Sequence, residues 1–279
     1  MSTPLTNGED LEYCQTVDIS SNGFAWREHG DGELVVLLHG LGGSRIAWDA
    51  QLVGLGDQWR VAAWDMPGYG EAAPLPDDPL TFPALAAAAA EWIAALGAES
   101  AHVIGISMGA MVAQHLAARH PARVRSLALL SSSPKFGLDG TTADSWRAAR
   151  RAPLDAGFEP VDFAEQVLRG IAGPHITEFA FESQRAAMAR VTGSALRRSI
   201  DCVITHDATV FLSTIATSTL VIVGALDRET PVAYSQYLVD HLPYARLAVV
   251  PGAGHLVNAE APALVNQLLV EHLTAVEAS

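Results

Sequence analysis

The fold is decided by residues 101–109, which read AHVIGISMG. The apolar run at the start is typical of a strand buried on both faces, and the residues after it repeat apolar positions as one face of a helix does. The motif G-x-S-x-G at this junction predicts a turn so sharp that side chains at positions 105 and 109 would collide. We therefore expect Ser107 to lie strained at the start of the helix, with its hydroxyl presented as a nucleophile.

Other short apolar runs indicate further buried strands, at residues 34–38, 61–64, 126–130, 220–223 and 247–250. Helical patterns separate these runs, and strands that alternate with helices predict an α/β fold. We expect a mostly parallel central sheet with helices on both faces, because runs without polar alternation suit strands that are covered on each side.

The beginning of the chain follows a different pattern. Residues 12–19 and 24–28 flank a Ser-Asn-Gly turn. Such a turn between two strand-like segments is a hairpin signal, because Asn and Gly tolerate the left-handed backbone that tight hairpin turns require. We therefore expect an antiparallel hairpin at the N-terminal edge of the sheet.

One connection is too long for a simple crossover. Parallel strands are joined by about a dozen residues or more, whereas residues 131–218 separate two neighbouring apolar runs and contain helical patterns of their own. We expect an inserted helical cap at 134–205, with the core of the fold divided between residues 1–133 and 206–279.

Two backbone N–H groups are candidates for holding an oxyanion beside Ser107. One belongs to Met108, the residue after the serine. The other belongs to Leu41 in the loop 39–44, HGLGGS, which follows an apolar run and whose glycines allow the backbone to approach closely. The sequence therefore predicts an oxyanion hole made by Leu41 and Met108.

The general base and its acid are predicted from their places at the ends of strands. His255 ends the stretch PGAGH after the last apolar run, and Asp227 follows the run at 220–223. Both lie at the carboxyl ends of predicted strands, where Ser107 also emerges and where sites collect in open α/β sheets. We expect Ser107, Asp227 and His255 to form a triad in which His255 takes the serine proton and Asp227 orients the imidazole.

These motifs resemble those of the α/β-hydrolase superfamily. The resemblance covers residues 11–133 and 206–279 and includes HGLGG at 39–43, DMPGYG at 65–70, the elbow around Ser107, and Gly254-His255. It implies the α/β-hydrolase fold with an inserted cap, and a serine hydrolase that needs neither a cofactor nor a metal. In this family the turn that begins at Asp65 is structural, so Asp65 is left outside the triad.

Within the superfamily, the Ser-Met-Gly elbow, the size of the cap and the segment 135–150, with Trp146 and Arg147, are similar to the 3-oxoadipate enol-lactonase group. The resemblance implies hydrolysis of a small ester or lactone through an acyl-enzyme. Three alternatives stay open on the same fold. One is carbon–carbon bond hydrolysis of a vinylogous diketone acid, as in the meta-cleavage hydrolases, and another is a signalling receptor that turns over slowly. The third is a cofactor-free oxygenase or perhydrolase.

Composition excludes several other classes of function. The chain has 279 residues, of which 49% are hydrophobic, and its 31 acidic and 17 basic residues give a net charge of −14. Such a surface repels phosphate backbones and anionic membranes, so neither a nucleic acid nor a membrane is an expected partner. Two separated cysteines indicate no metal site, and the absence of a signal peptide predicts a cytoplasmic protein. The oligomeric state is left open.

The predicted cap has its own charge pattern. Residues 134–201 hold nine basic and nine acidic residues, so this segment is neutral and arginine-rich. Ion pairs on helix surfaces are one explanation. The other is that a cap arginine, with Arg147 and Arg185 as candidates, binds a substrate carboxylate. The aromatic candidates for the lining of the pocket are Trp146, Trp48, Phe136, Phe179 and Phe181.

Overall fold

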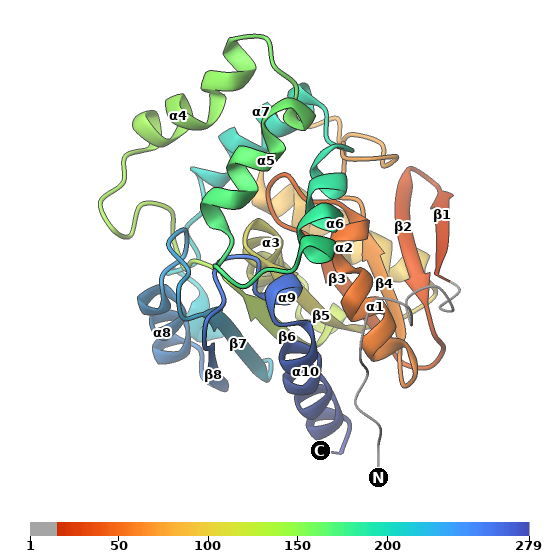
Figure 1. The fold of residues 1–279 in the computed structure, drawn as a ribbon. Coiled ribbons are helices and arrows are strands. Elements are labelled where there is room, and N and C mark those ends of the chain that lie inside the picture. Colours follow the sequence, from red (N-terminus) through yellow and green to blue (C-terminus); the bar gives the residue numbers. More distant parts are fainter. Residues whose placement is uncertain (1–15, 279) are drawn as a thin grey trace.

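The computed structural model describes residues 16–278. Strands of this segment form one eight-stranded sheet (Figure 1). In spatial order they are β1 (Val17–Ser21), β2 (Phe24–His29), β4 (Arg60–Trp64), β3 (Leu34–Leu38), β5 (Ala101–Ile106), β6 (Val124–Leu130), β7 (Thr219–Gly224) and β8 (Ala245–Val250). The pairs β1–β2 and β2–β4 are antiparallel and the other pairs are parallel, which confirms the predicted fold class.

The predicted strands agree closely with the observed ones. The runs at 34–38 and 101–106 match β3 and β5 to the residue. The other parallel strands begin one or two residues before their apolar runs, and the added residues include Arg60, Arg125 and Arg246. A charged residue at the amino end of a strand ends the apolar run in the sequence but does not end the hydrogen bonding between strands.

The N-terminal hairpin is also present. It turns at Asn22 and Gly23, whose φ angles of 51° and 82° both lie in the left-handed region, as an Asn-Gly hairpin turn requires. The first strand was expected from residue 12; residues 12–15 lie outside the described residues, and the described strand begins at Val17.

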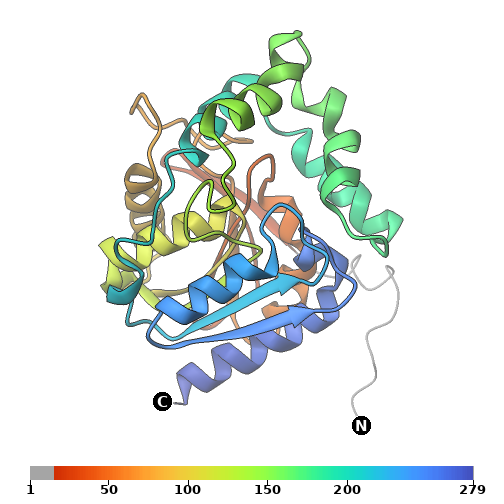
Figure 2. The ribbon, with the colours of Figure 1, turned by 90° about the vertical axis from the view of Figure 1, so that its left-hand side faces the viewer.

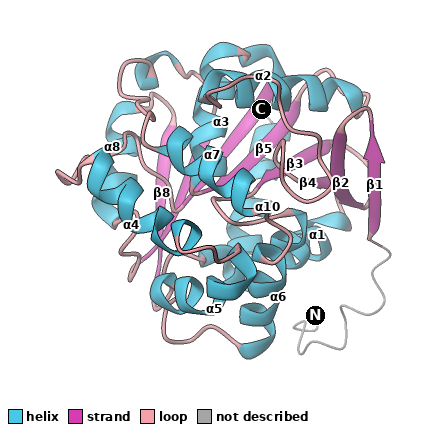
Figure 3. Ribbon diagram, turned by 90° about the horizontal axis from the view of Figure 1, so that it is seen from above, coloured by secondary structure: helices cyan, strands magenta, loops and turns pink. Residues whose placement is uncertain are grey.

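Helices cover both faces of the sheet (Figure 3). The helices α1 (Asp49–Gly56) and α10 (Pro262–Glu277) pack on one face. The opposite face is covered by α2 (Phe82–Ala95), α3 (Met108–Arg119) and α8 (Val232–His241). None of the helices within residues 16–278 is long and apolar enough to cross a membrane.

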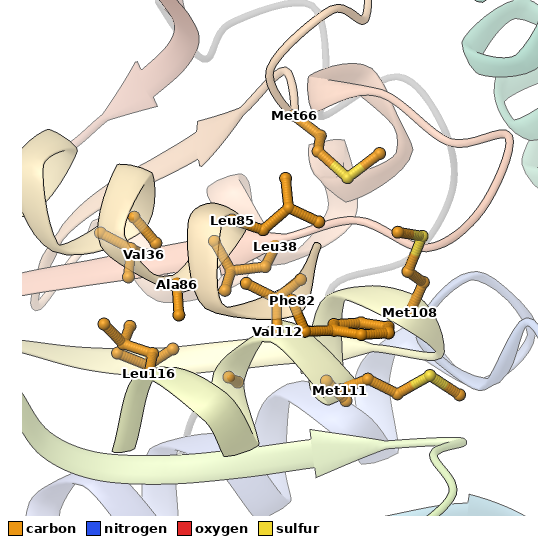
Figure 4. Close-up of a cluster of buried hydrophobic side chains, with 14 of the residues drawn as sticks. Val36, Leu38, Met66, Phe82, Leu85, Ala86, Met108, Met111, Val112 and Leu116 are labelled. Atoms are coloured by element: carbon orange, nitrogen blue, oxygen red, sulfur yellow. The ribbon is translucent and has the colours of Figure 1, made fainter. Parts of the chain in front are cut away.

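Strand β3 shows why the central runs are apolar at every position. Val36 and Leu38 enter the cluster beneath α2 and α3, which Figure 4 shows. Val35 and Leu37 enter the cluster beneath α1 and α10. Because successive side chains of a strand point to opposite faces, a strand covered on both sides has no position left for a polar residue.

Four helices form the insertion between β6 and β7. They are α4 (Ala143–Asp155), α5 (Pro160–Ile171), α6 (Glu178–Met188) and α7 (Gly193–Val203), and they lie together on the side of the sheet away from the end of α10 (Figures 1 and 2). Three of them begin after a threonine whose hydroxyl accepts a backbone N–H three residues on: Thr142, Thr177 and Thr192. The predicted helical insertion is thus present, and its limits at 134 and 205 stay a proposal.

Two buried histidines lie in an aromatic cluster between α3 and the segment after α7. The ring centroid of His115 is 5.0 Å from that of Phe82 and 5.5 Å from that of His206. Neither ring nitrogen of His115 has a hydrogen-bond partner within residues 16–278. Burial lowers the pKa of His115 to about 3 and that of His206 to about 4, so both imidazoles are neutral in the folded protein at neutral pH.

We predict that the folded protein loses stability as the pH falls from 6.5 towards 4. Unfolded histidines bind protons below pH 6.5, whereas His115 and His206 resist protonation until pH about 3 to 4 in the fold. Protons therefore favour the unfolded chain, by at most about 1.4 kcal/mol per pH unit for each histidine. Urea denaturation across this pH range should show a shallower loss of unfolding free energy for His115→Phe, and equal slopes for both proteins would contradict the prediction.

Candidate active site

Ser107 lies in the sharp turn between β5 and α3. Its φ of 52° and ψ of −120° are rarely adopted by a residue with a side chain, and such a conformation costs about 1–3 kcal/mol. A Cβ atom at Gly105 would lie 2.5 Å from the carbonyl oxygen of Gly109, and one at Gly109 would lie 2.0 Å from that of Leu38. Both glycines are therefore required for α3 to pack directly on β5 and β3, with Ser107 in the turn between β5 and α3.

The loop after β3 lies against Ser107. A Cβ atom added to Gly40 would be 3.1 Å from the Cβ atom of Ser107. The backbone N–H of Leu41 in this loop has no acceptor within residues 16–278, and that of Met108 opens α3, where the first N–H groups have no partner inside the helix. Both N–H groups are therefore free to donate to a ligand, and their role as an oxyanion hole stays a prediction.

His39 holds this loop in place. Its Nε2 accepts a hydrogen bond from the backbone N–H of Met66 at 2.9 Å, so Nδ1 carries the proton and donates to the carbonyl oxygen of Gly40, also at 2.9 Å. Burial lowers the pKa of His39, which keeps the imidazole neutral, so that one ring nitrogen accepts a hydrogen bond while the other donates one. The loop that carries Leu41 is therefore fixed before any ligand binds.

His255 and Asp227 form a buried pair at the ends of β8 and β7. Nδ1 of His255 lies 3.0 Å from Oδ2 and 3.1 Å from Oδ1 of Asp227. Asp227 also accepts bonds from the backbone N–H groups of Glu229 and Thr230, each at 2.9 Å, and from the Thr230 hydroxyl at 2.9 Å. With so many donors around it, the carboxylate is held ionised and oriented towards the imidazole.

The pair shifts the pKa of each partner in opposite directions. Burial on its own lowers the pKa of His255, but the charge of Asp227 and its hydrogen bond outweigh burial, so the pKa of the imidazole lies above its usual value. Burial on its own raises the pKa of Asp227, but His255 and the Thr230 bonds outweigh it and lower the pKa of this carboxyl group. Asp227 therefore stabilises the protonated form of His255.

A cavity of about 800 Å³ joins these groups. Ser107, His255, Leu41 and Met108 are among its lining residues, together with residues of α4 to α7 and of the segments 133–141 and 228–234. No hydrogen bond joins Ser107 to His255 within the described part of the chain; bonds between a nucleophile and its base are often long without a ligand and shorten when one binds. The elements named above thus bring Ser107, His255, Leu41 and Met108 to one cavity, and Asp227 contacts His255 without itself lining the cavity.

The aromatic candidates divide into two sets. Phe136 and Trp146 line the cavity. The other three do not: Trp48 is buried beneath the sheet with α1, Phe181 packs inside the cap, and Phe179 is 61% exposed at the surface of the cap. The difference follows from the face of each element on which the residue lies, which an isolated aromatic residue in the sequence does not reveal.

Arg147 and Arg185 lie outside the lining of the cavity. Arg147 pairs with Asp144 at 3.1 Å and with Asp201 at 3.2 Å, and Arg185 pairs with Glu182 on its own helix. Surface ion pairs thus occupy both candidates. Their binding of a substrate carboxylate stays a prediction.

The cationic groups that line the cavity are Lys135, Arg150 and Arg228. Lys135 pairs with Asp207 at 3.3 Å, and Arg150 pairs with Glu229 and lies over the ring of Trp146. Arg228 is exposed and has no ion pair among residues 16–278. It follows Asp227 directly, so the side chain with the least competition for an anion stands beside the predicted triad.

The sequence patterns did not identify two residues that hold the site together, Thr230 and Glu260. Thr230 caps the Asp227 carboxylate, and its position three residues after an aspartate in a turn is the available signal. Glu260 bonds the loop of His255 and a segment of the cap 87 residues away. A contact across that separation leaves no local signal in the sequence.

Comparison with known proteins is consistent with this geometry. A family model described as the alpha/beta hydrolase fold matches residues 33–175. The chain is 32% identical over 256 residues to the pimeloyl-[acyl-carrier protein] methyl ester esterase of Neisseria meningitidis, and the match covers 85% of this chain and 93% of that protein. A thermophilic esterase from Thermogutta terrifontis has a similar structure, with a TM-score of 0.82, 26% identity, and coverage of 94% of this chain and 99% of that chain.

The enol-lactonase from Burkholderia xenovorans LB400 is also similar in structure. Its TM-score is 0.75, its identity is 22%, and the match covers 92% of this chain and 100% of that chain. At this identity the likeness shows the fold alone. It does not separate enol-lactonases from other hydrolases that share the fold.

We predict that Asp227→Asn lowers the pKa of the His255 imidazole. The substitution keeps the shape of the side chain but removes the charge that raises this pKa above 6.5. The proton NMR signals of the His255 ring, followed as a function of pH, should therefore titrate at a lower pH in the variant. Asp144→Asn, at an exposed position of α4, is the matched control and should leave the titration unchanged; an unchanged titration in Asp227→Asn would contradict the pairing.

Proposed function

The chain belongs to the α/β-hydrolase family and is a serine ester hydrolase, and on this basis we propose that it cleaves a small carboxylic ester through an acyl-enzyme on Ser107. The observation that carries this proposal is that His255, which lines the same cavity as Ser107, forms a buried pair with Asp227. In this assignment Asp227 orients the base, and the N–H groups of Leu41 and Met108 form the oxyanion hole.

The proposed reaction has two halves. His255 accepts the Ser107 proton as the serine oxygen attacks the ester carbonyl carbon, and the two N–H groups stabilise the oxyanion. His255 then gives the proton to the departing alcohol oxygen, which leaves the acyl group on Ser107. Water, deprotonated by His255, adds to the acyl carbon, and release of the acid returns the proton to Ser107.

The lining of the cavity supports an acyl chain with an anionic end as the substrate class. Apolar side chains lie beside the catalytic groups, namely those of Phe136, Trp146, Val167, Leu168 and Met188. Arg228 supplies an unpaired cation in the same cavity. The similar Neisseria protein acts, by its name, on the methyl ester of a pimeloyl group, and we therefore place short-alkyl esters of such chains first.

Lactones are the second candidate, because a lactone is a cyclic ester and is opened by the same attack and the same oxyanion hole. A panel of methyl esters, lactones and a yellow ring-fission product separates the possibilities. Hydrolysis of methyl esters with the highest kcat/KM supports the first candidate. Preference for lactones supports the second, and bleaching of the ring-fission product supports carbon–carbon bond hydrolysis instead.

We predict that Ser107→Ala lowers kcat for ester hydrolysis by about 10⁴- to 10⁶-fold, because the variant lacks the attacking oxygen. Turnover of a p-nitrophenyl ester measures the loss. Ser145→Ala, at an exposed serine of α4, is the matched control and should keep the activity. A sulfonyl fluoride should modify Ser107 in the wild-type protein, and retention of most of the turnover by Ser107→Ala would exclude this serine as the nucleophile.

We predict that Arg228→Gln raises KM about fivefold for an ester that carries a terminal carboxylate, the effect of losing one exposed ion pair. Hydrolysis of an equally long ester with an uncharged end should be unaffected. Arg147→Gln and Arg185→Gln belong in the same experiment, because these are the cap arginines that the sequence favours. An unchanged KM in Arg228→Gln would exclude a role for this residue, and a raised KM in either other variant would transfer that role to the cap arginine concerned.

A further inference from the structure

Glu260 makes a set of contacts that the proposed reaction does not use. It is the last residue of the short helix α9 (Val257–Glu260), which follows the His255 loop, and it does not line the cavity. Its Oε2 accepts hydrogen bonds from the backbone N–H groups of Gly254 at 2.7 Å and of Gly173 at 2.8 Å. Its Oε1 accepts a third from Leu256 at 3.0 Å. One carboxylate therefore accepts hydrogen bonds from the backbone of Gly254 before His255, of Leu256 after it, and of Gly173 in the cap.

The backbone of the cap reaches the same loop directly. The N–H group of His255 donates to the carbonyl oxygen of Ile171, the last residue of α5, at 3.0 Å. A Cβ atom at Gly254 would lie 2.5 Å from the backbone nitrogen of Gly173, and one at Gly173 would lie 2.4 Å from Oε2 of Glu260. The absence of side chains at both glycines lets the two backbones meet around the carboxylate.

We propose that Glu260 is a positioning residue, which fixes His255 against Asp227 and fastens α5 of the cap to the same loop. The inference rests on the proposed role of His255 as the base. All three N–H groups of residues 254–256 are bonded, two of them to one carboxylate. Bonds to an ionised acceptor are about twice as strong as neutral ones. An imidazole that must meet a carboxylate on one side and a serine on the other gains from such a fixed backbone, because misplacement by about 1 Å can cost about 100-fold in rate.

Helix α5 connects the Glu260 contacts to the substrate cavity. Val167, Leu168 and Ile171 of α5 line the cavity. A ligand packed against α5 therefore presses on the helix whose last carbonyl group holds the His255 backbone. Glu260 bonds both sides of that junction, so the position of the base depends on how α5 is seated.

Glu260→Gln tests the proposal because the side chain keeps its size but turns an N–H₂ group towards backbone donors. We expect kcat to fall about 10- to 100-fold while KM stays within about threefold. We also expect the His255 imidazole to titrate at a lower pH by NMR, since its contact with Asp227 loosens. The other charged groups that act on this ring, Glu229 and Arg150, are unchanged in the variant. Glu271→Gln, at an exposed position of α10, is the matched control and should change neither quantity.

Gly173→Ala tests the contact from the cap side. Its methyl group would collide with Oε2 of Glu260, so we expect the same loss of kcat and the same direction of change in the His255 titration. Thermal unfolding of both variants shows whether they are folded. The NMR titration requires no substrate, so it tests Glu260 even if the proposed function fails, and that failure would show separately as a wild-type protein without Ser107-dependent ester hydrolysis.

Two results would overturn the proposal. One is a folded Glu260→Gln protein with kcat and His255 titration equal to the wild type. The other is a loss of activity that follows the unfolded fraction alone, with an unchanged pKa of His255 in the folded protein, which would reduce Glu260 to a structural residue.

Discussion

The close approach of α3 to β5 and β3 is the constraint on which the rest of the structure depends. No side chain fits at Gly105 or Gly109, where a Cβ atom would lie 2.5 Å or less from a backbone oxygen. This contact forces Ser107 into a strained conformation and directs it away from the sheet. Packing in the surrounding core offsets the cost of this strain, because α3 is buried against two strands and α2 over most of its length.

The parallel strands extend this arrangement to the other groups. The loops after β3, β5, β7 and β8 all leave the sheet at the carboxyl edge, which is why residues distant in sequence meet at one cavity. The surroundings of Asp227, His255 and His39 then give each of these residues a different protonation behaviour. His255 and the donors of its own turn keep Asp227 ionised, Asp227 makes His255 more basic, and burial keeps His39 neutral so that it holds the loop of Leu41 in place.

Local patterns predict those parts of the fold and the site that depend on local chemistry. The buried strands, the hairpin turn and the glycines around Ser107 each follow from residues within a few positions. Arg147 is a residue that local patterns do not place, because its partner Asp201 lies on another helix of the cap. The sequence shows equal numbers of charges in the cap, but only the packing of α4 on α7 determines which arginines are paired and which face the cavity.

The cap is joined to the catalytic loops in two physically different ways. On the α4 side, Arg150 pairs with Glu229 beside the acid, and both side chains are about one-third exposed. Water and salt weaken such a pair, and its contribution is small. On the α5 side, backbone groups and the Glu260 carboxylate bond the cap to the loop of the base, around buried glycines. The contact of α4 with the loop of Asp227 is therefore weaker than the contact of α5 with the loop of His255.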